Sequence, residues 1–141
     1  MIMGAWGLGH FENDSALDFA GDIEDSKNPK QLFIDTLDNA INSDYLDADD
    51  ACYAIVAAAY VDSKIKGTRY SGPEDEEPMD MDTFCNKNRS LDLADLKDKA
   101  VGALMRVLND DSELKELWEE NEEDYPLWRS NVEQLIVRLS K

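Results

Sequence analysis

Residues 51–66 read ACYAIVAAAYVDSKIK, and this stretch decides the fold class. Up to Val61, apolar residues occupy nearly every side of the helix that the stretch predicts, and its alanines permit close helix approach. A helix of this kind is stable when other elements enclose it. The acids in residues 47–50 favour a helix start, because carboxylates complement the positive end of the helix dipole, and Gly67 ends the helix.

Five further stretches carry apolar residues at helical spacing, which predicts a helix in each of them. These helices begin near Asn13, at Pro29, near Asp92, near Glu113 and at Asp124. Asn28 caps the second of them, and Pro29 suits its first turn because an N–H there would have no partner. The apolar stripe of that helix runs from Leu32 to Ile41. Residues 109–112 break the helix before them and cap the one that follows.

No alternating run of apolar and polar residues is long enough for a strand, and no internal repeat is evident. We therefore expect an all-α fold, a compact single-domain bundle of five or six helices over residues 1–141. Residues 1–12 lack helical periodicity and predict an irregular, glycine-rich leader. Residues 67–90 contain the run GPEDEEPMDMD, whose two prolines and six acids predict a solvated acidic loop.

Several features of the sequence bear on the cellular location that we expect for the protein. No apolar run approaches the roughly 18 residues that a membrane-spanning helix needs, so no membrane partner is expected. The start of the chain has neither the basic region nor the long apolar region of a secretory signal. Cys52 and Cys85 are too few for a disulfide framework and too far apart for a CxxC motif. These features predict a cytoplasmic protein with reduced thiols.

The charge balance is strongly acidic. The chain has 32 Asp and Glu residues against 14 Lys and Arg residues, which gives a net charge of −18. This excludes nucleic acid as an expected partner, because phosphate binding rests on Lys and Arg. It favours fast, salt-sensitive association with a basic partner, although a solvated face that only aids solubility has the same composition. Between Asp110 and Asp124 the imbalance is greatest, with nine acids against one base, Lys115.

Two stretches carry a family resemblance: GAWGLGHFENDSALDF at 4–19 and DSELKELWEENEEDYPLWRSNVEQL at 111–135. In both, the chain resembles the bacterial family called domain of unknown function 4259. The matching positions are Gly4, Trp6, Gly7, Phe11, Asn13, Asp14, Ala16, Leu17, Asp18, Ser112, Glu113, Leu114, Leu117, Trp118, Tyr125 and Trp128. The chain departs from the family pattern at Met1 and Ile2 and in the acidic residues 67–90. The resemblance implies a compact helical domain and no particular reaction.

The glycine-rich start could cradle a phosphate or act as a structural plug. Phosphate binding needs glycines between a strand and a helix start, and here no strand precedes Gly4, the spacing is not GxGxxG, and nearby acids repel anions. We therefore expect the glycines to let the backbone turn tightly while aromatic side chains dock on the bundle. The residues expected to act structurally are Gly4, Trp6, Gly7, Phe11, Asp14, Trp118 and Trp128.

Few residues offer catalytic chemistry. His10, the only histidine, could act as a general base beside Asp14 or Glu12, and an enzyme of this kind is one alternative. Cys52 lies in the apolar helix and is expected to be inert, whereas Cys85 lies in the acidic loop. Hard cations favour carboxylate oxygens, and the loop offers such oxygens at Asp75, Asp80 and Asp82. The EF-hand pattern fails there, however, so we expect no metal site and no cofactor.

The acidic surface is the better candidate for function. Our first hypothesis is a non-enzymatic interaction protein that blocks a basic protein surface, concretely an immunity protein against a basic secreted bacterial toxin. Tyr125 and Tyr70 are the expected exposed aromatic anchors. The residues expected to contact the partner are Glu113, Glu116, Glu119, Glu120, Glu122, Glu123, Asp124, Tyr125, Glu74, Asp75, Glu76 and Glu77. A nucleic-acid mimic that blocks a DNA-binding protein is the other alternative.

The plug interpretation of the glycine-rich start predicts a stability effect at Trp6. Trp6→Ala should lower the free energy of unfolding by about 3–5 kcal/mol, as for a buried aromatic residue, and should spare binding by the folded fraction. Urea denaturation of the two proteins measures the difference. Iodide quenching that shows a fully exposed indole at Trp6, with Trp6→Phe as the blank, would contradict the interpretation.

Overall fold

The computed structural model describes residues 19, 21–23, 25–66 and 93–140. The named elements are α2 (Pro29–Asn42), α3 (Ala48–Lys66), the 3-10 turn η1 (Ala94–Leu96), α5 (Lys97–Val107), α6 (Glu113–Glu119) and α7 (Tyr125–Ser140). Residues 19, 21–23 and 25 are helical as well. The described part of the chain contains no strand, only one isolated bridge. The predicted all-α fold is therefore confirmed.

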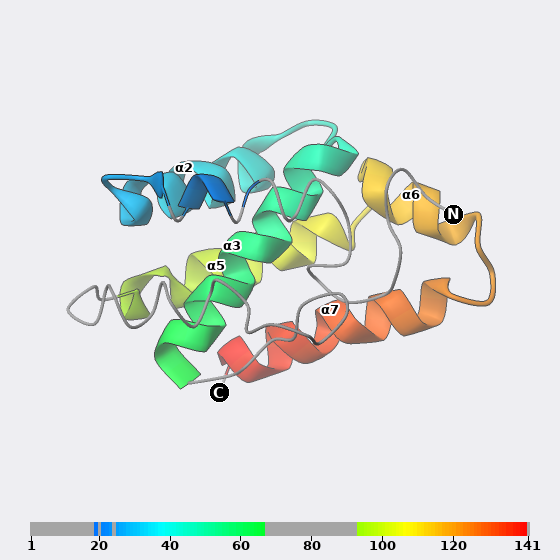
Figure 1. Cartoon of the computed structure of the whole chain (residues 1–141). Helices are drawn as coiled ribbons and strands as arrows, with labels where there is room; N and C mark the ends of the chain where they lie inside the picture. Colours follow the sequence, from blue (N-terminus) through cyan, green and yellow to red (C-terminus); the bar gives the residue numbers. More distant parts are fainter. Residues whose placement is uncertain (1–18, 20, 24, 67–92, 141) are drawn as a thin grey trace.

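Helix α3 crosses the middle of the bundle, with α2 on one side of it and α7 on the other (Figure 1). Helices α5 and α6 also pack on it. From Ala51 to Asp62 every side chain is buried except Tyr53, which is half-buried. The prediction that a helix apolar on all sides is enclosed by others is therefore confirmed. This arrangement is stable because burial of each side removes apolar surface from water.

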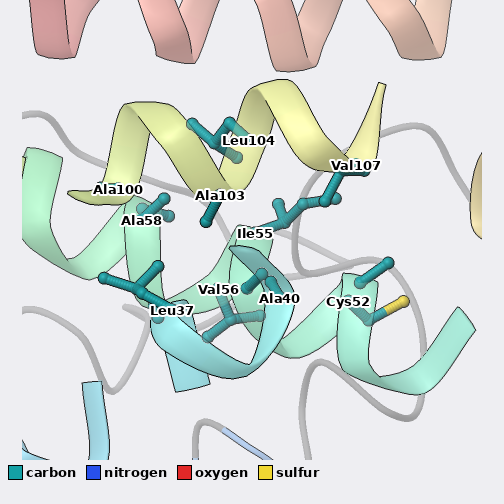
Figure 2. Close-up of a cluster of buried hydrophobic side chains, with 14 of the residues drawn as sticks. Leu37, Ala40, Cys52, Ile55, Val56, Ala58, Ala100, Ala103, Leu104 and Val107 are labelled. Atoms are coloured by element: carbon teal, nitrogen blue, oxygen red, sulfur yellow. The ribbon is translucent and has the colours of Figure 1, made fainter. Parts of the chain in front are cut away.

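Small side chains let the helices approach α3 closely. Figure 2 shows one buried cluster to which three helices contribute. Its labelled members are Leu37 and Ala40 of α2, Cys52, Ile55, Val56 and Ala58 of α3, and Ala100, Ala103, Leu104 and Val107 of α5. Alanine occupies four of these ten positions, and the distance between packed helices depends on the size of the side chains at the contact.

The ends of the helices follow local sequence at most positions. Asn28 caps α2 as predicted, because its Oδ1 accepts a hydrogen bond from Gln31 N at 3.3 Å. The helix predicted from about Asp92 to Leu108 begins as the 3-10 turn η1 and continues as α5. Ser112 occupies the N-cap position of α6, but its side chain makes no capping hydrogen bond. The break and the new helix start predicted at residues 109–112 are confirmed, with α5 ending at Val107 and α6 starting at Glu113.

One fully buried carboxylate links α3 to α7. Asp62 is 0% exposed, and its Oδ2 accepts a hydrogen bond from Arg138 Nε at 3.0 Å. Burying a carboxylate is costly unless a cation and hydrogen bonds compensate for the lost water. The pair therefore holds the second half of α3 to the last turns of α7.

Arg106, in the last turn of α5, joins two turns of the chain. Its guanidinium donates hydrogen bonds of 2.9 to 3.3 Å to four backbone carbonyl oxygens. These oxygens belong to Ser43, Asp44, Asp110 and Asp111. The first two follow α2 and the last two follow α5, so one side chain holds the α2–α3 turn against the α5–α6 turn.

Backbone pairing fixes the register of the same two turns. Leu46 N donates to Asp111 O at 2.8 Å, and Glu113 N donates to Leu46 O at 2.8 Å. These bonds make the isolated parallel bridge between Leu46 and Ser112, both of which are 0% exposed. Asp111 has a φ of 61°, in the left-handed region that Asp tolerates better than most residues. The bridge sets the start of α6 directly against the start of α3.

The role of Arg106 predicts a stability effect. Arg106→Lys keeps the charge but loses the planar fork that reaches several carbonyl oxygens at once. The free energy of unfolding in urea should fall by about 1.5–3 kcal/mol, the range for hydrogen bonds to charged groups. The control Asp110→Asn changes a 99% exposed side chain on the same turn, so its effect should stay within about 0.5 kcal/mol. Equal stabilities for the two variants would contradict this role of Arg106 in holding the two turns together.

Candidate functional site

Two tryptophans set the orientation of α6. Leu114 and Trp118 are its buried side chains. The ring of Trp118 stacks on Trp128 of α7, with centroids 6.0 Å apart and planes at 12°. Both tryptophans are 5% exposed, in keeping with the structural role expected for them. Because this side of α6 packs inward, Glu116 and Glu119 on the opposite side are exposed to solvent.

Five carboxylates gather on the outward side of α6 and on the turn after it, and we call them the α6 acidic surface. They are Glu116, Glu119, Glu120, Glu122 and Glu123, all exposed. Lys115 is the only cation that pairs with any of them within the described residues, at 3.4 Å from Glu119. Its side chain is only 16% exposed and is shared with Asp110 at 3.8 Å. The surface therefore presents largely uncompensated negative charge.

Glu113, expected to contact a partner, is instead part of the fold. It is half-buried, and its Oε1 accepts a hydrogen bond from Ala48 N at 2.8 Å. Ala48 is the first residue of α3, where backbone N–H groups lack partners within the helix. The Glu113 carboxylate therefore caps α3 from another element and adds favourable charge at its N-terminus.

Asp124 and Tyr125 are also held within the molecule. Asp124 is half-buried, and its Oδ2 accepts a hydrogen bond from Asn121 Nδ2 at 2.9 Å. The Tyr125 ring lies against Trp128, with centroids 6.2 Å apart, and its hydroxyl accepts a hydrogen bond from Arg129 Nη1 at 3.1 Å. Tyr125 is half-buried, so the expectation of an exposed aromatic anchor at this position is wrong.

An exposed aromatic side chain does lie beside the α6 acidic surface, and it is Tyr45. Its ring is 50% exposed, and its hydroxyl donates to Glu116 Oε1 at 3.3 Å. Loss of solvation, followed by the negative charges of Glu116, Glu113 and Asp111, raises the pKa of the Tyr45 hydroxyl above its ordinary value. Sequence reasoning missed this residue because 71 positions separate the two partners and no local pattern links them.

Several predicted residues lie outside the described part of the chain. They are Gly4, Trp6, Gly7, His10, Phe11, Asp14, Tyr70, Glu74, Asp75, Glu76, Glu77, Asp80, Asp82 and Cys85. Within the described residues, no group of three or more His, Cys, Asp or Glu side chains could hold a metal ion.

Cys52 is a buried thiol on α3. Burial, with smaller contributions from the charges of Asp49 and Asp47, raises its pKa to about 12. A thiol reacts as its thiolate, which is scarce at neutral pH when the pKa is this high. Cys52 therefore has the properties of an inert core residue.

The fold and the surface define an all-α protein with a strongly acidic outward face. The family model described as "Domain of unknown function (DUF4259)" matches residues 4–131, and the chain belongs to this family. Neither the comparison with curated proteins nor the comparison with solved structures finds a match. Among the helices that the structure describes, none has both the length and the apolar character needed to cross a bilayer.

The burial of Cys52 predicts slow chemical modification. In the Cys85→Ser variant, at about pH 8, Cys52 should react with iodoacetamide about a thousandfold more slowly than in the same protein unfolded in guanidinium. The reason is that a pKa of about 12, against an ordinary value of 9.0, lowers the thiolate fraction by roughly that factor. Mass spectrometry follows the reaction, and equal rates in both states would show that the thiol is accessible.

Proposed function

We propose that this protein is a non-enzymatic interaction protein that binds a basic protein surface. The observation that supports the proposal most directly is the α6 acidic surface. Its five carboxylates are exposed, and a single lysine is paired with one of them within the described residues. Packed carboxylates repel one another, and a cationic partner relieves that repulsion while forming charge-assisted hydrogen bonds.

The contacts that the acids make within the fold show which carboxylates are available to a partner. Glu113 and Asp124 are occupied within the fold, whereas Glu120, Glu122 and Glu123 make no ion pair with any described residue. Glu116 accepts only the Tyr45 hydroxyl among the described side chains. Exposed single ion pairs contribute little, so binding would depend on several of these carboxylates acting together. Charge complementarity of this kind mainly accelerates association and orients the partner.

The specific form of the proposal is an immunity protein in the cytoplasm that blocks a basic toxin. A toxin that handles nucleic acid or nucleotides needs a cationic site, because its substrate carries phosphate charge. A protein with a dense carboxylate surface competes for that site sterically and electrostatically. The net charge of −18 supports rapid, long-range attraction to such a target.

Charge reversal tests the proposal. The variant changes Glu116, Glu119, Glu120 and Glu123 to Lys. The matched control changes four exposed acids away from α6 to Lys, namely Asp22, Asp25, Asp95 and Asp98. The two variants have the same net charge, so only the position of the charge differs.

Co-purification from the source cells, followed by calorimetry with the identified protein, provides the measurement. We expect the wild-type chain and the control each to retain a stoichiometric basic partner. The α6 variant should bind that partner at least about a hundredfold more weakly than the wild type. Affinity for the wild type should fall between about 50 and about 300 mM salt, since exposed charges are screened. If the partner is toxic, co-expression of the chain should restore growth. Absence of a basic partner, or equal affinity for both variants, would contradict the proposal.

A further inference from the structure

Three exposed apolar side chains belong to elements that contact one another near the α6 acidic surface. In the described residues, five large apolar side chains are exposed, namely Ile41, Tyr45, Met105, Leu127 and Val137. The last two lie on α7. The first three belong to the end of α2, the α2–α3 turn and α5, and α5 contacts both α2 and this turn.

Ile41 and Met105 border the contact between α2 and α5. A Cβ atom placed on Gly102 of α5 would lie 3.6 Å from Ile41 Cδ1, so the Ile41 side chain covers Gly102. Met105 follows Gly102 by three residues and therefore lies on the same side of α5. The stripe of the second predicted helix was expected to bury Ile41, yet 39% of it is exposed.

Tyr45 extends this apolar area toward α6. Arg106, the residue after Met105, donates hydrogen bonds to the carbonyl oxygens of Ser43 and Asp44. Tyr45 is the next residue in the chain, and its hydroxyl is bonded to Glu116 of α6. Hydrogen bonds therefore link α5, next to Met105, to the turn that carries Tyr45, and link Tyr45 to the α6 acidic surface. We call Ile41, Tyr45 and Met105 the Tyr45 patch.

The charges around the Tyr45 patch are negative. Asp44, Asp111 and Glu116 are exposed beside it. Among the described cations of α5 and α6, Arg106 binds backbone carbonyl oxygens, and Lys99 and Lys115 are paired with carboxylates. An apolar centre with an acidic rim matches a partner with an apolar side chain among lysines or arginines. A second copy of this chain would bring its own acids against this rim, which like-charge repulsion disfavours.

We infer that the Tyr45 patch is the apolar centre of the interface with a basic protein. This inference rests on the proposed function and adds which residues contribute most of the binding energy. Buried aromatic anchors contribute most of the binding energy in many interfaces, while the surrounding charged contacts contribute orientation. Tyr45 suits this role because Glu116 already orients its ring, so less conformational freedom is lost on binding. Met105 adapts its flexible thioether to the partner's shape.

A peptide pair tests the inference. The probes are a short arginine-rich peptide with a central tryptophan and the same peptide with glycine in place of tryptophan. The variant is Tyr45→Ser with Met105→Ser. The control is Leu127→Ser with Val137→Ser, whose side chains are 54% and 52% exposed against 50% and 56% for Tyr45 and Met105. Circular dichroism verifies the fold of both.

Fluorescence anisotropy gives the affinities. The wild-type chain and the α7 control should bind the tryptophan peptide at least about tenfold more tightly than the glycine peptide, and the patch variant should lose this preference. If the wild-type chain binds both peptides with equal affinity, and charge reversal on α6 weakens the binding of both peptides, the inference about the Tyr45 patch is overturned. The proposed function is then still supported.

Two other outcomes also decide the matter. If charge reversal on α6 changes neither affinity, the proposed function fails together with the inference. If sedimentation shows that the wild-type chain is a dimer and the patch variant a monomer, the occupant is a second copy and the inference is overturned.

Discussion

The enclosure of α3 is the constraint on which the other elements depend. From Ala51 to Asp62, α3 carries apolar side chains on nearly every side. It is therefore stable only while α2, α5, α6 and α7 cover these side chains. The alanines in its sequence favour this enclosure, because small side chains allow α2 and α5 to pack close to it (Figure 2). Each surrounding helix then needs only one apolar stripe, which leaves its other side free to carry charge. The acidity of the protein is compatible with a dense core for this reason.

The start of α3 is where the core meets the candidate surface. Arg106 and the Leu46–Ser112 bridge hold the α2–α3 and α5–α6 turns together, and this arrangement brings Glu113 to the first N–H group of α3. Glu113, one acid of a strongly acidic stretch, thus serves as a cap, while the five carboxylates of the α6 acidic surface remain exposed. The same junction places Tyr45 against Glu116. Folding and the proposed binding therefore use neighbouring carboxylates for different purposes.

Local sequence predicted the helices well because their signals act over a few residues. Asn28 and Pro29 specify a helix start by hydrogen bonding and by a fixed φ angle, and the structure has that start. Local signals do not settle the surroundings of every side chain. Glu113 caps α3 because α6 packs beside the start of that helix, and Tyr125 packs on Trp128 and accepts a hydrogen bond from Arg129, three and four positions along α7. Ile41 is 39% exposed although it belongs to the apolar stripe of α2.

The sequence by itself determined the all-α class, the central position of residues 51–66, the family and the acidic character of residues 110–124. Periodicity, capping and composition are local properties, and they suffice for these conclusions. Only the tertiary structure decided which acids are free and which aromatic side chain accompanies them. Those outcomes depend on contacts such as Glu113 with Ala48 and Tyr45 with Glu116, which join residues 65 and 71 positions apart. Such contacts arise from the packing of whole helices around α3, so no short stretch of sequence encodes them.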